Sequence, residues 1–469
     1  MRTLLVEDDE GVVRLLTEAT ASEPIEWTVA GTREEGERAL QDTEFDLLIF
    51  DLRLPDRRGD TPRDEAGLSL LDAASSACPG TSTFVLSAYA TIDNLRPYQN
   101  ANDLEGETHA LKVTAFTKDD FSPVLTAIRA RSEQWTELRR IEIYRGTPPV
   151  SLSYHQERVL RLFVRRQHAA KGILLPVGGG LSSASKLRVA IVDSNGGHLL
   201  DSIARLTTPA AVRDESERYR TCIAPLRPGF FAHLIDTVEP GAGRTAGLLY
   251  RLAEGFDRAL ADIVIIDPLA AAGTVSQIES GTIVWTAARS WVRRTIGDVR
   301  RQLMTDEELT SNRSRAPSFD FGAIEALELV SPALRQHGDL HVFNVLVDAN
   351  AQPMLIDFAD AGVYSAPIDA IALELSLLFH PGVTKRLGPW PTPAQLRTWA
   401  DVDAWARDSP APDYIRRCRA WALEIAEGER PVLAAAYAYA ARQLKYKDVA
   451  TERILGVLEA VAERARTAW

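Results

Sequence analysis

Cysteine is scarce in this 469-residue chain, which contains only Cys78, Cys222 and Cys418, each in a different sequence context. Three scattered cysteines favour neither a disulfide framework nor a Cys-x-x-Cys metal site. Long apolar runs are also missing, so no segment predicts insertion into a membrane. Positive charge is in deficit, with 53 Lys and Arg against 65 Asp and Glu. The resulting net charge of −12 argues against a nucleic-acid-binding body, because binding to phosphates requires a basic surface.

The start of the chain lacks the apolar stretch of a secretory leader, since it reaches Glu7, Asp8 and Asp9 almost at once. Together with the scarcity of cysteine, this start predicts a protein of a reducing, bacterial-type cytoplasm.

The stretch WVRRTIGDVRRQ is a local cluster of positive charge. Arg293 and Arg294 stand one heptad before Arg300 and Arg301, which predicts that the four side chains share one helical face. Such a face is most simply a solvated one, although an acidic partner or a phosphate could dock on it.

The length of the chain predicts two or three domains. Residues 1–135 alternate short apolar runs with amphipathic stretches, which indicates a parallel sheet covered on both faces by helices. Residues 136–170 are charged and helical in pattern, and we interpret them as a connector. Residues 171–256 contain β-like runs with glycine turns, and residues 257–469 are mostly helical in pattern. The implied arrangement is a small β-rich lobe followed by a larger helical lobe.

Five polar residues follow the predicted strands of the first domain. Glu7 and Asp8 follow LLV, Asp51 follows LLIF, Ser87 follows FVL, and Lys118 follows AFT. Reactive residues of an open parallel sheet collect beyond the carboxyl ends of its strands. Three carboxylates there would suit Mg²⁺, while a hydroxyl and an ammonium could hold phosphoryl oxygens. Unrelated surface charges are the alternative, but five suitable residues in this order argue against it.

The motifs FDLLIFDLRLPD and VLSAYAT closely resemble those of response-regulator receiver domains, over residues 1 to about 130. The resemblance implies a flavodoxin-like doubly wound fold and a histidine kinase as phosphodonor. It also implies that Asp51 is the phospho-acceptor, that Glu7 and Asp8 bind Mg²⁺, that Ser87 is the switch hydroxyl and that Lys118 contacts the phosphate.

Two features depart from the receiver pattern. Asp119 and Asp120 follow Lys118 where the family usually has proline, and their charge should disfavour a dianionic phosphoryl group nearby. Ala115 occupies the usual place of the switch aromatic, and the adjacent Phe116 should point to the other face of the strand.

A second site is predicted by HGDLHVFNVLVDANAQPMLIDF, residues 337–358. Asp339 stands five residues before Asn344, which stands thirteen before Asp357. A strand–turn–strand pattern between them would return the last carboxylate to the first. Phosphoryl transfer needs metal ligands and a carboxylate that orients the acceptor, and these spacings match the catalytic and metal-binding loops of kinase-like enzymes.

This stretch resembles the aminoglycoside phosphotransferase and choline-kinase branch of the protein-kinase-like fold, over roughly residues 171–469. The resemblance implies a bilobal, ATP-dependent phosphotransferase. Asp339 would then be the catalytic base or acceptor-orienting carboxylate, Asn344 and Asp357 would hold Mg²⁺, and His337 would brace the loop. His341 fits the same pattern with a less definite role.

The nucleotide-binding residues are less clear. VGGGLSSAS could form the glycine-rich turn over the phosphates. Its candidate residues are Gly179, Gly180, Ser182 and Ser183. Where kinases carry a phosphate-binding lysine, the best equivalent is Arg205, with Glu215 or Glu217 as its partner. Arginine presents a planar fork instead of a compact ammonium group. Lys186 is the candidate that would supply such an ammonium group.

Three functions fit these motifs. The first is a phosphorelay response regulator whose receiver controls a kinase-like enzyme that phosphorylates an unknown hydroxyl of a protein or small molecule. The second is a non-catalytic pseudokinase adaptor of a bacterial signalling or conflict system, which Arg205 favours. The third is an antibiotic-modifying phosphotransferase, because an acidic protein suits a polycationic substrate. The joint presence of Asp339, Asn344 and Asp357 favours an active enzyme.

Overall fold

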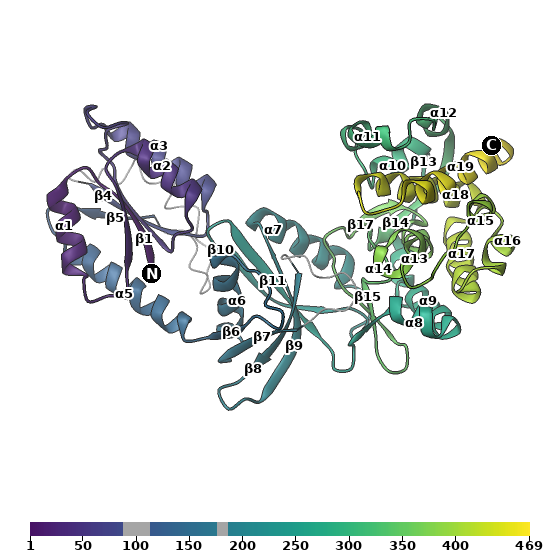
Figure 1. Ribbon diagram of the computed structural model, residues 1–469, viewed down its shortest axis with the longest axis horizontal. Coiled ribbons are helices and arrows are strands. Elements are labelled where there is room, and N and C mark those ends of the chain that lie inside the picture. Colours follow the sequence, from purple (N-terminus) through teal and green to yellow (C-terminus); the bar gives the residue numbers. More distant parts are fainter. Residues whose placement is uncertain (88–112, 176–185) are drawn as a thin grey trace. The chain divides into compact units, whose positions relative to one another are not determined.

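A computed structural model describes residues 1–87, 113–175 and 186–469 (Figure 1). The chain forms two compact units. The first holds the described residues up to Arg213 together with Leu234–Leu252, and the second holds Asp214–His233 and Ala253–Trp469. Within the described ranges, no helix is both long enough and apolar enough to cross a bilayer.

The first unit begins with a five-stranded parallel sheet in the order β2-β1-β3-β4-β5. Its strands are β1 (Arg2–Val6), β2 (Glu26–Ala30), β3 (Leu47–Asp51), β4 (Ser82–Ser87) and β5 (Val113–Thr117). Its described helices are α1 (Glu10–Ala19), α2 (Arg33–Asp42), α3 (Asp64–Ala77) and α5 (Ser122–Arg139). This strand order is that of the doubly wound flavodoxin-like fold, which confirms the predicted class.

Apolar side chains cover both faces of this sheet, as the uninterrupted apolar strands predict. Phe50 packs on one face with the α2 and α3 side, and Ile49 packs on the other with α1 and α5. Alternation also separates Ala115 from Phe116, whose ring meets Phe84 edge-on with centroids 5.1 Å apart. The prediction that the aromatic residue faces away from Ala115 is therefore confirmed.

A six-stranded sheet completes the first unit, in the order β10-β11-β9-β8-β7-β6. Its elements are β6 (Glu142–Tyr144), α6 (Tyr154–Arg166), β7 (Lys171–Leu175), β8 (Lys186–Val192), β9 (His198–Thr207), β10 (His233–Ala242) and β11 (Thr245–Leu252). Helix α6 buries Val159 and Phe163 against this sheet. Segment 136–170, interpreted as a helical connector, thus also supplies an edge strand, because β6 pairs in parallel with β7.

Contacts between α6 and the loop that precedes β3 join the two sheets of the first unit. The hydroxyl of Tyr154 donates a 2.5 Å hydrogen bond to Asp46, and Arg158 Nη1 lies 2.9 Å from the same carboxylate. The ring of His155 shares a 2.9 Å hydrogen bond with the carbonyl of Phe45. These contacts attach the start of α6 to the amino-terminal edge of the parallel sheet, the edge opposite Asp51.

The second unit is mainly helical, as predicted, with two three-stranded sheets, β12-β15-β16 and β13-β14-β17. Its strands are β12 (Arg258–Ala259), β13 (Ser290–Thr295), β14 (Glu328–Gln336), β15 (Val345–Val347), β16 (Pro353–Leu355) and β17 (Gly362–Ser365). Helix α7 (Pro209–Arg218) enters this unit and is followed by a π-helical turn, Tyr219–Ile223. The other helices are α8 (Leu260–Ile266), α9 (Pro268–Gly281), α10 (Ile296–Arg301), α11 (Asp306–Asn312), α12 (Phe321–Glu325), α13 (Ile368–Phe379), α14 (Pro381–Thr384), α15 (Pro393–Arg397), α16 (Val402–Arg407), α17 (Pro412–Ala426), α18 (Glu429–Arg442) and α19 (Thr451–Ala468). Every residue of α13 is buried, which makes it a central element of this unit.

The prediction of one helical face of four arginines is wrong. Arg293 and Arg294 lie in strand β13, and only the second pair of arginines lies in helix α10. Thr295 starts that helix, since its side chain caps the amide of Asp298 while the Asp298 carboxylate accepts from the Thr295 amide. A helix therefore begins between the two arginine pairs, so no single helix carries all four arginines.

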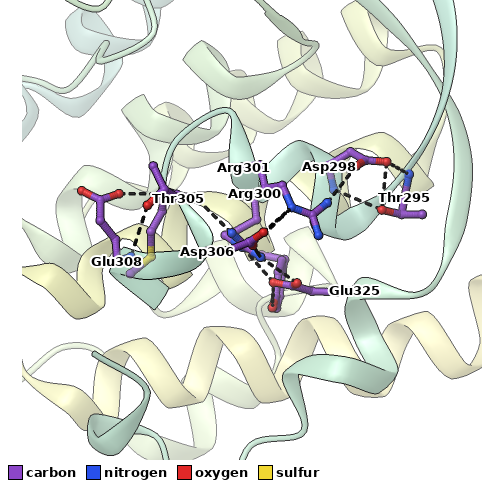
Figure 2. A network of polar contacts seen from close by, with 10 residues as sticks. Thr295, Asp298, Arg300, Arg301, Thr305, Asp306, Glu308 and Glu325 are labelled. Atoms are coloured by element: carbon purple, nitrogen blue, oxygen red, sulfur yellow. Dashed lines mark hydrogen bonds and ion pairs between the residues drawn. The ribbon is translucent and has the colours of Figure 1, made fainter. Parts of the chain in front are cut away.

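Arg300 is an internal cation and not a surface one (Figure 2). Its side chain is 1% exposed, with Nη2 at 2.6 Å from Asp306 and 2.8 Å from Glu325. Arg301 lies 2.8 Å from Asp298 and 3.0 Å from Asp306. These carboxylates pair with both guanidinium groups, so Arg300 and Arg301 belong to an ion-pair network within the second unit.

Candidate functional site

The first candidate site lies at the carboxyl edge of the parallel sheet. Glu7 and Asp51 are 2% and 5% exposed, whereas Asp8 is exposed. Each offers a carboxylate oxygen, and these oxygens all lie within 4.8 Å of one another. Mutually repelling carboxylates at this spacing fit a hard divalent cation such as Mg²⁺, which would offset their charge. The structure thus brings together the three predicted metal ligands.

Lys118 follows β5 and bridges the two buried carboxylates. Its Nζ lies 2.8 Å from Glu7 and 2.7 Å from Asp51. Burial and the charge of Asp51 raise the pKa of Glu7 to about 7, against the influence of Lys118. Burial also raises the pKa of Asp51, and Lys118 again opposes the shift. The backbone amide of Lys118 donates to the carbonyl of Ser87 over 3.1 Å, so all five predicted residues lie at one edge.

One of the two acidic residues after Lys118 has a structural task. Asp119 and Asp120 are both exposed, and Asp120 accepts a 2.8 Å hydrogen bond from the amide of Ser122, the first residue of α5. The Asp120 carboxylate therefore satisfies one of the free amides at the start of α5.

The second candidate site is built on the loop between β14 and β15. The buried ring of His337 donates from Nε2 to the carbonyl of Ile356 over 2.9 Å. The amides of His337 and Gly338 donate to the two carboxylate oxygens of Asp369 at 2.7 and 2.9 Å. Gly338 has φ +81°, and a Cβ there would lie 2.2 Å from the carbonyl oxygen of Asp360. Glycine is therefore required, and His337 braces the loop.

Sequence reasoning missed Asp369, a fully buried carboxylate at the start of α13. Burial raises the pKa of Asp369. The charge of His337 and the hydrogen bonds from the amides of His337 and Gly338 oppose this shift. The only signal of Asp369 in the sequence is that it is one of two carboxylates, with Glu374, in the otherwise largely apolar PIDAIALELSLLF. A buried charge without partners would be costly, so such an acid predicts internal hydrogen bonds.

Asn344 links the two ends of the predicted motif. Its side chain is buried and donates from Nδ2 to the carbonyl of Asp339 over 2.8 Å. Its carbonyl accepts from the amide of Ile356 over 3.0 Å, which places Asp357 next to it. Strands β15 and β16 pair antiparallel between them, as predicted. Asp357 has φ +69°, an uncommon backbone conformation for a non-glycine residue that is enriched at functional sites.

The carboxylate of Asp339 has a partner from a distant helix. Arg442, near the end of α18, donates from Nη1 to Asp339 Oδ1 over 3.0 Å, and its Nη2 lies 3.4 Å from Asp360. Burial lowers the pKa of Arg442, but the charges of Asp339 and Asp360 together with Tyr446 and Tyr439 oppose it, and the net shift is upward. The ring of His341 approaches Asp339 to 3.8 Å. Arg442 was also missed from the sequence, since no local spacing connects it to Asp339.

The nucleotide-binding predictions are only partly placed. The loop candidates Gly179, Gly180, Ser182 and Ser183 lie outside the described residues. Arg205 lies on β9 directly across from Lys186 on β8, in register with it. Glu215 is buried on α7, whereas Glu217 is exposed and forms an ion pair with Arg220 at 2.7 Å.

Comparisons with known proteins address the two halves of the chain separately. A response regulator receiver domain protein (CheY-like) from Methanospirillum hungatei JF-1 is 23% identical over 29% of this chain and 96% of that one, with a TM-score of 0.23. The response regulator protein TrrA from Thermotoga maritima, solved with Mg²⁺ and BeF, is 22% identical over 28% of this chain and 97% of that one, with a TM-score of 0.21. No curated protein matches the chain. Residues 258–373, which contain Asp339, Asn344 and Asp357, match the APH family model, described as the phosphotransferase enzyme family.

Proposed function

We propose that this protein is a response regulator in which phosphorylation of Asp51 controls an ATP-dependent phosphotransferase. The observation that supports it best is the hydrogen-bonded frame Asp339–Asn344–Ile356, because it holds the elements for acceptor orientation and metal binding at one place. The Lys118 bridge between Glu7 and Asp51 supports the regulatory half of the proposal.

In the receiver, a carboxylate oxygen of Asp51 attacks the phosphorus of a histidine kinase's phosphohistidine, and the P–N bond breaks. Glu7, Asp8 and Asp51 would hold Mg²⁺, which when bound neutralises charge on the phosphoryl oxygens. Lys118 would exchange one of its carboxylate partners for a phosphoryl oxygen. Ser87, at the end of the neighbouring strand, would donate to another.

In the phosphotransferase half, Asp339 accepts the hydrogen bond of the acceptor hydroxyl and directs its oxygen toward the γ-phosphate of ATP. Asn344 and Asp357 would hold Mg²⁺ on the nucleotide phosphates. Arg442 and Asp369 position this machinery, the first through the Asp339 carboxylate and the second through the loop amides. The described residues do not define a chemical class for the phosphate acceptor.

The Asp339–Arg442 ion pair also supports a second candidate, a binding-only adaptor. A carboxylate already paired with a guanidinium at 3.0 Å is less available to an acceptor hydroxyl. Arg205 at the usual lysine position points the same way.

ATP binding and ATP hydrolysis in the presence of Mg²⁺ distinguish the candidates. We expect turnover in the wild type, its loss in Asp339→Ala and Asp357→Ala, and a change on adding beryllofluoride that Asp51→Asn abolishes. ATP binding without turnover would favour the adaptor. Equal turnover with and without beryllofluoride would refute control by the receiver while leaving the enzyme intact.

A further inference from the structure

A cavity of about 660 Å³ lies in the first unit, and no described residue of either candidate site lines it. Its wall is formed by α5, α6, the end of β10 and the amino-terminal edge of the parallel sheet. Cavities of roughly 300–1,000 Å³ are typical of small-molecule sites. Its size therefore suits a ligand and exceeds what a few waters require.

The cavity wall carries an excess of positive charge. Its arginines are Arg131, Arg158, Arg165 and Arg166, and its carboxylates are Asp46 and Glu239. Both carboxylates are engaged: Asp46 accepts hydrogen bonds from the Tyr154 hydroxyl and the Arg2 amide as well as from Arg158, and Glu239 forms an ion pair with Arg213. Arg158 and Arg166 also have carboxylate partners, Asp46 and Asp236, each at 2.9 Å, so the argument for a bound anion rests on Arg131.

Arg131 carries the argument, because it has no carboxylate partner. In the described ranges it forms no ion pair, and its one printed hydrogen bond runs from Nη1 to the amide oxygen of Gln134 over 3.3 Å. Burial, reinforced by the charge of Arg158, lowers its pKa. Arg158 in turn buries an Nε atom that has no hydrogen-bond partner. Two partly buried guanidiniums that repel each other are costly for the free protein, and an anion between them would offset the cost.

The rest of the wall is mixed, with Ser82, Gln134 and His168 beside apolar side chains. Trp135, Leu138, Leu162 and Val238 line the cavity beside the arginines. The Trp135 ring is held in place, since its Nε1 donates to the Tyr154 hydroxyl over 3.0 Å. Apolar side chains beside a few charged groups suit a site that binds an organic body by packing and an anionic group by charge.

We propose that this cavity binds a phosphate monoester of mononucleotide size, with its phosphate between Arg131 and Arg158 and its organic body against Trp135 and Leu138. Planar guanidinium groups match phosphate geometry, and two of them suit a dianion. The proposal does not depend on phosphotransferase activity.

The test is thermal unfolding and calorimetric titration of the full chain with the four ribonucleoside 5′-monophosphates, with adenosine and inorganic phosphate as controls. An Asp357→Ala background without Mg²⁺ keeps the two candidate phosphoryl sites from contributing. We expect at least one monophosphate to bind and to raise the Tm, and Arg131→Gln to weaken it by at least tenfold. Arg140→Gln, which changes an exposed arginine next to α5 outside the cavity, should bind as the wild type does.

The Tm of Arg131→Gln without ligand provides a second readout. Removing a charge that has no ion-pair partner in the part of the chain that the structure describes, and that is repelled by Arg158, should leave the Tm of the variant unchanged or raise it. A lower Tm without ligand would show that Arg131 is a structural residue and would overturn the proposal. No binding of any monophosphate, or equal binding by Arg131→Gln, would overturn it as well. Stabilisation by inorganic phosphate equal to that by the best monophosphate would refute the assignment of a mononucleotide-sized ligand.

Discussion

Arg442 Nη1 and Asp339 Oδ1 lie 3.0 Å apart although 103 residues separate them in sequence. The Arg442 side chain is only 11% exposed, so the pair is screened less than a surface ion pair. Helix α18 thereby holds the carboxylate to which the proposed function assigns acceptor orientation, and the pair links the fold of the second unit to the proposed chemistry.

Replacing Arg442 tests whether this link helps catalysis. We expect Arg442→Met to lower kcat by about 10–100-fold with little change in KM for ATP, because Asp339 loses its orientation but nucleotide ligands remain. Arg442→Lys should recover part of the loss. Arg430→Met, at the other end of α18, is the control. Faster turnover in Arg442→Met would instead show that the arginine restrains Asp339.

Replacing Asp369 tests the loop clamp. Asp369→Ala leaves the amides of His337 and Gly338 without acceptors inside the protein, which should lower the free energy of unfolding of the second unit by about 3 kcal/mol. Chemical denaturation followed by hydrogen exchange of residues 337–344 would measure this. Glu424→Ala, at an exposed position of α17, should change stability by less than about 0.5 kcal/mol. A similarly small effect for Asp369→Ala would contradict the clamp.

Lys118 should compete with a metal ion for Glu7 and Asp51, because it already pairs with both carboxylates. Removing its charge in Lys118→Ala should strengthen Mg²⁺ binding by about tenfold or more, since the carboxylates lose their ammonium partner at 2.7–2.8 Å. Phosphorylation of Asp51 by acetyl phosphate should nevertheless fall, because the lysine no longer contacts the phosphoryl group. Calorimetric Mg²⁺ titration measures the first effect, with Lys171→Ala as the control. Unchanged Mg²⁺ affinity would show that Lys118 does not compete.

His380 predicts a loss of stability in mild acid. Burial and the neighbouring His341 lower the pKa of His380 from 6.5 to about 4. Above pH 6.5 the ring is neutral in both folded and unfolded chains, so its contribution is complete. As pH falls from 6.5 toward 4 the unfolded chain takes up the proton first, and stability falls by at most about 1.4 kcal/mol per pH unit for this group.

The His380 prediction is checked by urea denaturation between pH 7.5 and 4.5. His380→Asn should flatten the slope while preserving an acceptor for the Gly382 amide, which His380 Nδ1 accepts at 3.3 Å. His198→Asn, at an exposed position of the first unit, should leave the slope unchanged. An identical slope in wild type and His380→Asn would refute the assignment.

Residues at the ends of predicted strands or inside a known motif were predictable, and residues that helices bring to the site from elsewhere were not. Glu7, Asp51 and Lys118 were found because buried parallel strands end at one edge of a sheet. Arg442 and Asp369 act across 103 and about 30 residues, and nothing local in α18 or α13 distinguishes them as site residues.

The error over Arg293 and Arg300 has a different cause. The heptad spacing was real, but Thr295 and Asp298 form a capping box that starts a helix between them. The Thr-x-x-Asp spacing was visible in TIGD, so a local capping signal should outweigh a single heptad match.

The short strand β6 decides how this chain can be divided. Only Arg140 and Ile141 separate α5 from β6, and their amides donate back to Glu137 and Leu138. A fragment that begins at residue 171, where the composition changes, would leave the sheet without β6 and expose the backbone of β7. Such a fragment should aggregate through the exposed edge of β7. A fragment that keeps α5 and β6 should not, because β6 still pairs with β7. Helix α5 of the parallel-sheet fold is thus inseparable in practice from the sheet that follows it.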